Sequence, residues 1–277
     1  MTLPLRNSRL KLSCGKIFWR EVGKGPTLVF LHGSWSDGNQ WLPVIERLSL
    51  EYHCLAPDLL GFGESEQPDV HYSIELQLEF LAEYLKALNL QRVYLVGHSL
   101  GGWIAASYAL KYMDCVSGLV LLAPEGVKVE GVRRNWWWAR WLMEREKLVS
   151  WLLRSIPILG KLAKYKFLGW VEKIRHLLSP LQQMLESPVA CQLLFQRRSA
   201  EIEAELLQDR LPWLKIPVLI LQTEQDNPTA LALNQAYAKL APEAQLKLLS
   251  ESGNDLPEQL ADEVAKYIRQ FVISHSQ

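Results

Sequence analysis

The sequence predicts an α/β protein in which helices cover both faces of a mostly parallel sheet. Short runs of branched apolar residues alternate with segments of helical periodicity before residue 127 and again after residue 210. Such alternation is typical of parallel sheets whose strands are buried on both faces. The chain has 277 residues, of which 49% are hydrophobic, so it is long enough for one large domain with an inserted segment.

Each predicted element follows from a local pattern. Apolar runs predict buried strands at 27–31, 52–57, 93–96, 116–122, 218–221 and 245–249. From Ile74 to Leu88 the apolar residues recur in steps of four and three, which predicts an amphipathic helix. Helical patterns also follow Gly102 and occupy 229–240 and 260–271, while residues 9–22 predict an antiparallel hairpin at one edge of the sheet.

Residues 127–210 interrupt this alternation and contain helical patterns alone. Within them, the stretch 127–176 carries twelve basic and four acidic residues, and six of the chain's 11 tryptophans. We therefore predict an all-helical cap at 127–210, inserted into a core made of 1–126 and 211–277. Tryptophan mixed with Arg and Lys is also typical of helices that lie at a membrane surface. Two interpretations of the cap follow: its aromatic face packs on the core, or it contacts a membrane peripherally.

Composition excludes several function classes. Lys and Arg together number 30, as do Asp and Glu, and no nucleic-acid-binding module is recognisable, so no nucleic-acid partner is expected. No apolar run reaches the roughly 18–20 residues that span a bilayer, and no signal peptide is apparent, so we expect a cytoplasmic protein. The four cysteines form no C-x-x-C pair, and neither a metal motif nor a G-x-G-x-x-G turn is present. The expectation is reduced thiols, no metal and no cofactor.

A candidate nucleophile stands between a predicted strand and a predicted helix. Gly97-His98-Ser99-Leu100-Gly101 matches the G-x-S-x-G pattern of a nucleophile elbow in that context. The glycines let the chain turn sharply, so that the serine oxygen projects while backbone N–H groups point towards it. The alternative interpretation is that Ser99 only caps the helix, since serine is favoured there.

Two further motifs precede the elbow, each directly after a predicted strand. They are His32-Gly33-Ser34-Trp35 and Asp58-Leu59-Leu60-Gly61-Phe62-Gly63-Glu64-Ser65. In this order the three motifs resemble the α/β-hydrolase superfamily, over nearly the whole chain outside the cap. The resemblance implies the α/β-hydrolase fold with an inserted helical cap.

The resemblance also implies roles for individual residues. Ser99 would be the nucleophile, and the backbone N–H groups of Ser34 and Leu100 would form the oxyanion hole. Trp35, His32 and His98 would line the substrate pocket.

The acid and the base of the catalytic triad are less regular. Asp226 matches the family's acid, although Thr223 replaces the glycine of the usual Gly-x-x-Asp pattern, and Glu125 is the alternative acid. Gly253-Asn254 aligns with the family's Gly-His step. Asn254 can hydrogen-bond a carboxylate or a ligand, but an amide cannot shuttle a proton. Among substitute bases, His176 in the cap leads and His32 comes second.

These residues predict a serine hydrolase that acts on a lipophilic ester, with Ser99 as nucleophile, Asp226 as acid and an unconventional base. One alternative is a catalytically silent relative that binds a lipophilic acyl ligand, a partner or a membrane through its cap. Others are a cofactor-free lyase that uses the oxyanion hole, and an ordinary hydrolase in which Asn254 replaces a native histidine.

Overall fold

The computed structural model describes residues 3–129, 187–223, 226–249 and 257–275. The chain divides into two compact units, one made of residues 1–132 and 203–277 and the other of 133–202. In the second unit the structure describes α7 (Pro188–Cys191), the π-helical turn η4 (Gln192–Gln196) and the start of α8 (Ser199–Glu205). The residue range of the predicted cap, 127–210, includes the whole of the second unit, and the boundaries of the cap stay a prediction. The Trp/Arg-rich part of the cap lies outside the described residues.

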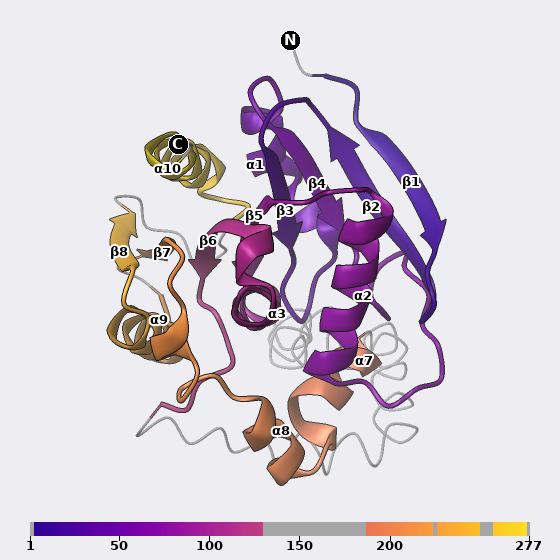
Figure 1. Cartoon of the computed structure of the whole chain (residues 1–277), viewed down its shortest axis with the longest axis vertical. Helices are drawn as coiled ribbons and strands as arrows, with labels where there is room; N and C mark the ends of the chain where they lie inside the picture. The colour runs from indigo at the N-terminus through magenta and orange to yellow at the C-terminus, as the bar shows by residue number, and fades with distance from the viewer. Residues whose placement is uncertain (1–2, 130–186, 224–225, 250–256, 276–277) are drawn as a thin grey trace, which may run out of the picture. The chain divides into compact units, whose positions relative to one another are not determined.

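The first unit is built on one eight-stranded sheet, with strand order β1-β2-β4-β3-β5-β6-β7-β8 (Figure 1). The strands are β1 (Arg6–Lys11), β2 (Lys16–Val22), β3 (Thr27–Leu31), β4 (His53–Pro57), β5 (Val93–His98), β6 (Val116–Leu122), β7 (Val218–Thr223) and β8 (Ala244–Leu249). β2 pairs antiparallel with β1 and with β4, whereas all other pairs are parallel. The predicted mostly parallel sheet is thus confirmed.

Parallel pairing brings the carboxyl ends of the central strands to one edge of the sheet. Leu31 of β3 lies opposite Gly97 of β5, His98 of β5 opposite Leu122 of β6, and Leu122 opposite Leu221 of β7. The loops after β3, β5, β6 and β7 therefore begin side by side. In open α/β sheets, ligands bind in the crevice at this edge.

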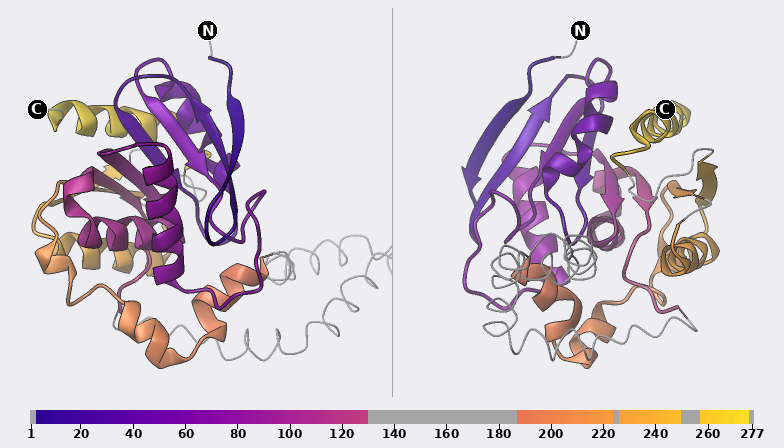
Figure 2. Two further views of the ribbon diagram at one scale, coloured as in Figure 1. Left: turned by 45° about the vertical axis from the view of Figure 1, so that its right-hand side comes forward. Right: turned by 180° about the vertical axis from the view of Figure 1, so that it is seen from behind.

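Helices cover both faces of the sheet, as the sequence predicts. They are α1 (Leu42–Leu48), α2 (Ile74–Ala87), α3 (Leu100–Lys111), α9 (Pro228–Leu240) and α10 (Ala261–Ser274), with the 3₁₀ turns η1 (Gly38–Trp41), η2 (Met113–Cys115) and η5 (Leu211–Trp213). α1 packs against α10 on one face, while α2, α3 and α9 lie on the other (Figure 2). α1 is an element that the sequence analysis did not predict.

Side-chain caps explain where two of these helices begin. The Ser73 hydroxyl accepts a hydrogen bond from Leu76 N at 3.0 Å and starts α2. The Asn227 side chain accepts from Ala230 N at 2.9 Å, and Pro228 follows at the first turn of α9. Both arrangements satisfy backbone N–H groups that a helix N-terminus leaves without intrahelical partners.

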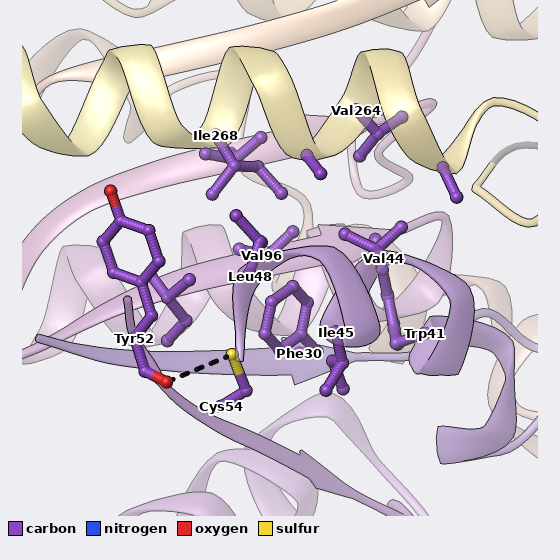
Figure 3. Close-up of a cluster of buried hydrophobic side chains, with 14 of the residues drawn as sticks. Phe30, Trp41, Val44, Ile45, Leu48, Tyr52, Cys54, Val96, Val264 and Ile268 are labelled. Atoms are coloured by element: carbon purple, nitrogen blue, oxygen red, sulfur yellow. Dashed lines mark hydrogen bonds between the residues drawn. The ribbon is translucent and has the colours of Figure 1, made fainter. Parts of the chain in front are cut away.

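A large hydrophobic cluster lies between the sheet and the α1–α10 pair (Figure 3). Alternate residues of β3 and β5, among them Phe30 and Val96, point into it, and Val264 and Ile268 of α10 cover them. Every other residue of these strands faces the opposite helices, so β3 and β5 are buried on both faces. No helix in the described ranges combines the length and the apolarity needed to cross a membrane.

Candidate active site

Ser99 occupies a strained backbone turn between β5 and α3. Its φ is 52° and its ψ is −113°, in a region that non-glycine residues rarely adopt. The backbone packs too closely around the flanking glycines to admit a side chain. A Cβ on Gly101 would lie 2.2 Å from the Leu31 carbonyl oxygen, and a Cβ on Gly97 would lie 2.5 Å from the Gly101 carbonyl oxygen. These positions confirm the sharp strand–turn–helix geometry expected of a nucleophile elbow.

Three hydrogen bonds join Ser99 to the end of β6 and to the turn that follows it. Ser99 N donates to the Leu122 carbonyl at 2.9 Å, and Glu125 N donates to the Ser99 carbonyl at 3.1 Å. The Ser99 Oγ–H donates to Glu125 Oε1, also at 3.1 Å. The hydroxyl of the predicted nucleophile is therefore bonded directly to a carboxylate.

The conformation of this turn is set by its neighbours. Ala123 has a φ of 44° and Gly126 a φ of 93°, which together fold the chain back over the elbow. The Tyr237 hydroxyl on α9 donates to the Glu125 carbonyl at 2.5 Å. Burial raises the pKa of Tyr237 far above its usual range, so the hydroxyl stays protonated and can donate this hydrogen bond. Glu125 itself is only 5% exposed.

The loop after β3 lies directly against the elbow. A Cβ on Gly33 would stand 2.8 Å from His98 Nδ1 and 3.5 Å from Ser99 Cβ. The Gln40 side chain joins the two segments, because its Oε1 accepts from Gly33 N at 3.0 Å and its Nε2 lies 3.1 Å from His98 Nδ1. The predicted oxyanion residues, Ser34 and Leu100, follow Gly33 and Ser99 directly, and both are buried.

His32 holds the backbone and is unsuited to act as the base. Leu59 N donates to its Nε2 at 3.0 Å, so Nε2 must be unprotonated and Nδ1 donates to the Gly33 carbonyl at 2.9 Å. Burial lowers the pKa of the imidazole, which keeps it neutral. With both nitrogens engaged and no surface exposed, His32 fixes the loop that carries Ser34.

His98 is also neutral. Its Nδ1 accepts from Gln40 Nε2, an orientation fixed because Gln40 Oε1 already accepts from Gly33 N. Burial, with a smaller contribution from nearby His32, lowers the pKa of His98 to about 4. Nε2 then carries the proton, so in this state His98 has no ring nitrogen left to accept one from Ser99.

The Asp58 motif organises the loop after β4. The Asp58 carboxylate accepts from Arg20 Nη1 at 2.6 Å, from Gly38 N at 2.8 Å and from Glu64 N at 2.8 Å. The pair that it forms with Arg20 is buried. Both oxygens of the Asp58 carboxylate accept hydrogen bonds from these donors, so its role is to hold this loop in place. The next residue, Leu59, binds His32 through its backbone N–H.

Asp226 lies after β7, but its carboxylate turns back on its own loop. Oδ2 accepts from Thr223 N at 3.0 Å, and Oδ1 accepts from the Thr223 hydroxyl at 2.8 Å. No hydrogen bond joins it to Ser99 in the described part of the chain. Its role as the acid therefore stays a prediction, and Glu125, the alternative acid, is the carboxylate that the structure brings to the serine.

The remaining predicted residues divide into those described and those outside the described ranges. Trp35 follows the oxyanion loop and is 37% exposed, so a large apolar ring is open to solvent or ligand beside Ser34. Asn254 and His176 lie outside the described residues, and their roles stay predictions. In the described ranges, no group of His, Cys, Asp and Glu side chains could hold a metal ion, and no disulfide joins any of the four cysteines.

Two residues of the site were missed by sequence reasoning. Gln40 bridges the oxyanion loop and the elbow, and Tyr237 holds the Glu125 carbonyl. Gln40 belongs to no motif, and Tyr237 sits within a helix that was predicted only as sheet cover. The available signal was weak: Tyr237 shares a helical face with Leu233, which marks it as buried without indicating a polar partner.

Comparison with known proteins identifies the family. A family model described as "Alpha/beta hydrolase family" matches residues 28–267, and the chain belongs to this family. The resemblance based on the three motifs is thereby confirmed.

Individual relatives are more distant. The chain is 38% identical over 117 residues to 2-hydroxy-6-oxo-2,4-heptadienoate hydrolase from Pseudomonas putida, which covers 40% of the chain and 41% of that protein. It is 23% identical over 292 residues to cis-3-alkyl-4-alkyloxetan-2-one decarboxylase from Shewanella oneidensis, covering 98% of the chain and 89% of that protein. Several curated relatives match only part of the chain, and the chain spans 32–41% of the length of those proteins.

A solved structure confirms the fold. Haloalkane dehalogenase DbeA from Bradyrhizobium elkani superposes with a TM-score of 0.74 at 19% identity, covering 99% of each chain. At that level of identity the likeness defines the fold alone.

Proposed function

We propose that this protein is a serine hydrolase of acyl esters, with Ser99 as the nucleophile. The observation that carries the proposal is the Ser99 hydroxyl itself. It stands on a strained elbow, against the loop that carries Ser34, and donates a hydrogen bond to the Glu125 carboxylate. A hydroxyl nucleophile needs such an acceptor, because it is unreactive while it keeps its proton.

The oxyanion hole is the second component. The Leu100 N–H is the first of α3, so no carbonyl within the helix can accept from it, and the helix dipole adds positive potential there. The Ser34 N–H follows Gly33, whose position against Ser99 Cβ sets this loop at the reacting centre. Donors fixed in advance stabilise the charge that develops on a carbonyl oxygen during acyl transfer.

An apolar acyl group is the substrate feature that the described residues favour. Trp35 presents a partly exposed ring beside Ser34, so an acyl chain bound at the oxyanion hole would contact it. The names of two relatives support chemistry at a carbonyl group, since one is a hydrolase of an oxo-dienoate and the other a decarboxylase of an oxetanone. The proposed substrate is therefore a lipophilic ester, and no cofactor is required.

Reaction with a fluorophosphonate probe tests this proposal, with hydrolysis of p-nitrophenyl acyl esters of increasing chain length as a second measurement. We expect the unmodified chain to be labelled and Ser99→Ala to remain unlabelled. Ser8→Ala, which alters a partly buried serine on β1 at the edge of the sheet, is the matched control and should label normally. Absence of labelling and of ester hydrolysis in the unmodified chain would contradict the proposal and favour a silent relative that binds its ligand without turnover.

A further inference from the structure

We propose that Glu125 is the general base of this site and takes the proton from Ser99 directly, without an intervening imidazole. This inference rests on the proposed function and adds to it the group that activates the nucleophile. In the usual arrangement a histidine stands between the serine and the acid. Here the carboxylate occupies the place at the serine oxygen.

The contact is built into the backbone. Glu125 N donates to the Ser99 carbonyl and Ser99 N donates to the Leu122 carbonyl, so the elbow and the turn are locked in register. On that frame Oε1 lies 3.1 Å from Ser99 Oγ, within the reach required of a general base. Tyr237 anchors the turn from the opposite side through the Glu125 carbonyl.

The other described titratable side chains near the serine form hydrogen bonds with groups other than Ser99. Both nitrogens of His32 are engaged with Gly33 and Leu59. The Nδ1 of His98 accepts from Gln40, and the carboxylate of Asp226 bonds Thr223. Glu125 is thus the described group that is both basic and in contact with Ser99 Oγ.

The reaction balances with Glu125 as the sole proton carrier. As Ser99 Oγ forms a bond to the carbonyl carbon, its proton passes to Glu125 Oε1 and the negative charge moves to the carbonyl oxygen. That charge is held by the Ser34 and Leu100 N–H groups while the bond to the alcohol oxygen breaks. Protonated Glu125 then donates its proton to the leaving alcohol, which yields the acyl-serine and restores the carboxylate.

Water completes the cycle by the same route. A water molecule adds to the acyl carbon and gives a proton to Glu125 as it does so. The bond between Ser99 Oγ and carbon then breaks, Glu125 returns the proton to Oγ, and the carboxylic acid leaves. One ester and one water are consumed, and one acid and one alcohol are formed.

A direct carboxylate base has a distinctive pH dependence. A histidine base loses its function as pH falls through about 6.5, whereas a carboxylate base loses it only where carboxyl groups take protons, below about pH 5. Among the residues that the structure describes, the other titratable groups near the elbow are His32 after β3, His98 on β5 and Tyr237 on α9. Burial lowers the pKa of both histidines and raises the pKa of the tyrosine, which favours the neutral form of each side chain. Between pH 8 and pH 5.5 the labelling rate should therefore lack the tenfold loss that an imidazole base with an ordinary pKa would produce.

The test compares second-order rate constants for fluorophosphonate labelling of Ser99 across this pH range. Glu125→Gln should lower the rate constant about 10²–10⁴-fold, the range for loss of a general base. Glu125→Asp, which keeps a base but withdraws it by one methylene, should give an intermediate rate. Glu203→Gln removes an exposed carboxylate that pairs with Lys128, and as the matched control it should label like the unmodified chain.

The outcomes separate the two proposals. If the unmodified chain is never labelled, the proposed function fails. If it is labelled but Glu125→Gln reacts equally fast, Glu125 is not the base and the proposed function stands. Should Glu125→Gln fail to fold, as judged by circular dichroism, Glu125→Asp decides: a labelling rate equal to that of the unmodified chain would overturn the assignment of Glu125 as the base.

Discussion

The turns after β6 and β7 place a carboxylate at the same position and use it differently. Glu125 stands three residues after Leu122, the last residue of β6, and Asp226 stands three residues after Thr223, the last residue of β7. Glu125 reaches forward to the Ser99 hydroxyl, whereas Asp226 reaches back to the N–H and hydroxyl of Thr223.

The difference comes from backbone conformation and from side-chain length. Positive φ at Ala123 and Gly126 curls the first turn over the elbow, so its side chain projects towards α3. In the second turn the shorter aspartate closes on its own backbone, an arrangement in which Asp side chains commonly stabilise loops. Position after a strand therefore does not decide which carboxylate reaches the Ser99 hydroxyl.

The most disruptive way to break this comparison is to remove the curl of the first turn. A Cβ at Gly126 would lie 2.3 Å from Trp103 Cδ1, and the residue also has a φ of 93°. We expect Gly126→Ala to lower the free energy of unfolding by about 2–5 kcal/mol, from left-handed strain and overpacking together. Urea denaturation measures this cost.

Ala123→Gly is the matched control in the same turn. It relieves positive-φ strain at the cost of chain entropy, so its stability should stay within about 1 kcal/mol of the unmodified chain. If both variants lost the same free energy of unfolding, the turn would be sensitive to any substitution, and the positive φ of Gly126 would not be the cause of the loss.

Titration of the buried His98 should change the free energy of unfolding with pH, which can be measured separately from the labelling rate of Ser99. The pKa of His98 is about 4 in the folded chain and near 6.5 in an unfolded one, so the unfolded state binds more protons between these values. Stability should therefore fall as pH drops from 7 to 4, with His98 contributing about 2–3 kcal/mol. Urea denaturation of His98→Gln across this range should show a correspondingly shallower decline, and an unchanged slope would contradict the assignment.

Loosening the anchor of the Glu125 turn tests the same contrast more gently. Tyr237→Phe leaves the buried Glu125 carbonyl without its O–H donor, which should cost about 1–3 kcal/mol in unfolding free energy. We also expect a several-fold slower labelling of Ser99, because the carboxylate is less firmly placed. Tyr84→Phe is the control: its buried hydroxyl has no hydrogen-bond partner among the described residues, so its loss should be neutral or stabilising. Unchanged labelling in Tyr237→Phe would argue against positioning through this bond.

The smallest effect is expected in the second turn. Thr223→Val removes the hydroxyl that donates to Asp226 Oδ1 but keeps the backbone donor. The loss should be about 1 kcal/mol in thermal or chemical unfolding, with the labelling rate of Ser99 within twofold of the unmodified chain. Thr223→Ser, which retains the hydroxyl, should behave like the parent. A large fall in labelling with Thr223→Val would show that Asp226 acts on the serine after all.

Sequence patterns predict the scaffold better than the chemistry. The apolar runs give the strands to within a residue or two, as with 27–31 and 116–122, because burial on both faces dictates their composition. α1 was missed because its seven residues carry too few turns for a periodic signal.

The G-x-S-x-G motif locates Ser99 because the close contacts at Gly97 and Gly101 admit no other residue type. The bond between Ser99 and Glu125 could not be foreseen, since it depends on the φ of Ala123 and on a tyrosine more than a hundred residues away. Two carboxylates at equal distances from their strands look alike in sequence, and only the three-dimensional course of each turn separates them.

The most direct test of this account measures Ser99 labelling in Glu125→Gln and Asp226→Asn side by side, at pH 7 and with both variants shown to be folded. Each substitution exchanges a carboxylate for an amide of nearly equal size, three residues beyond its strand. The account predicts that Glu125→Gln loses about 10²–10⁴-fold in rate and that Asp226→Asn loses far less. The reverse order, with Asp226→Asn nearly inert and Glu125→Gln nearly normal, would contradict it.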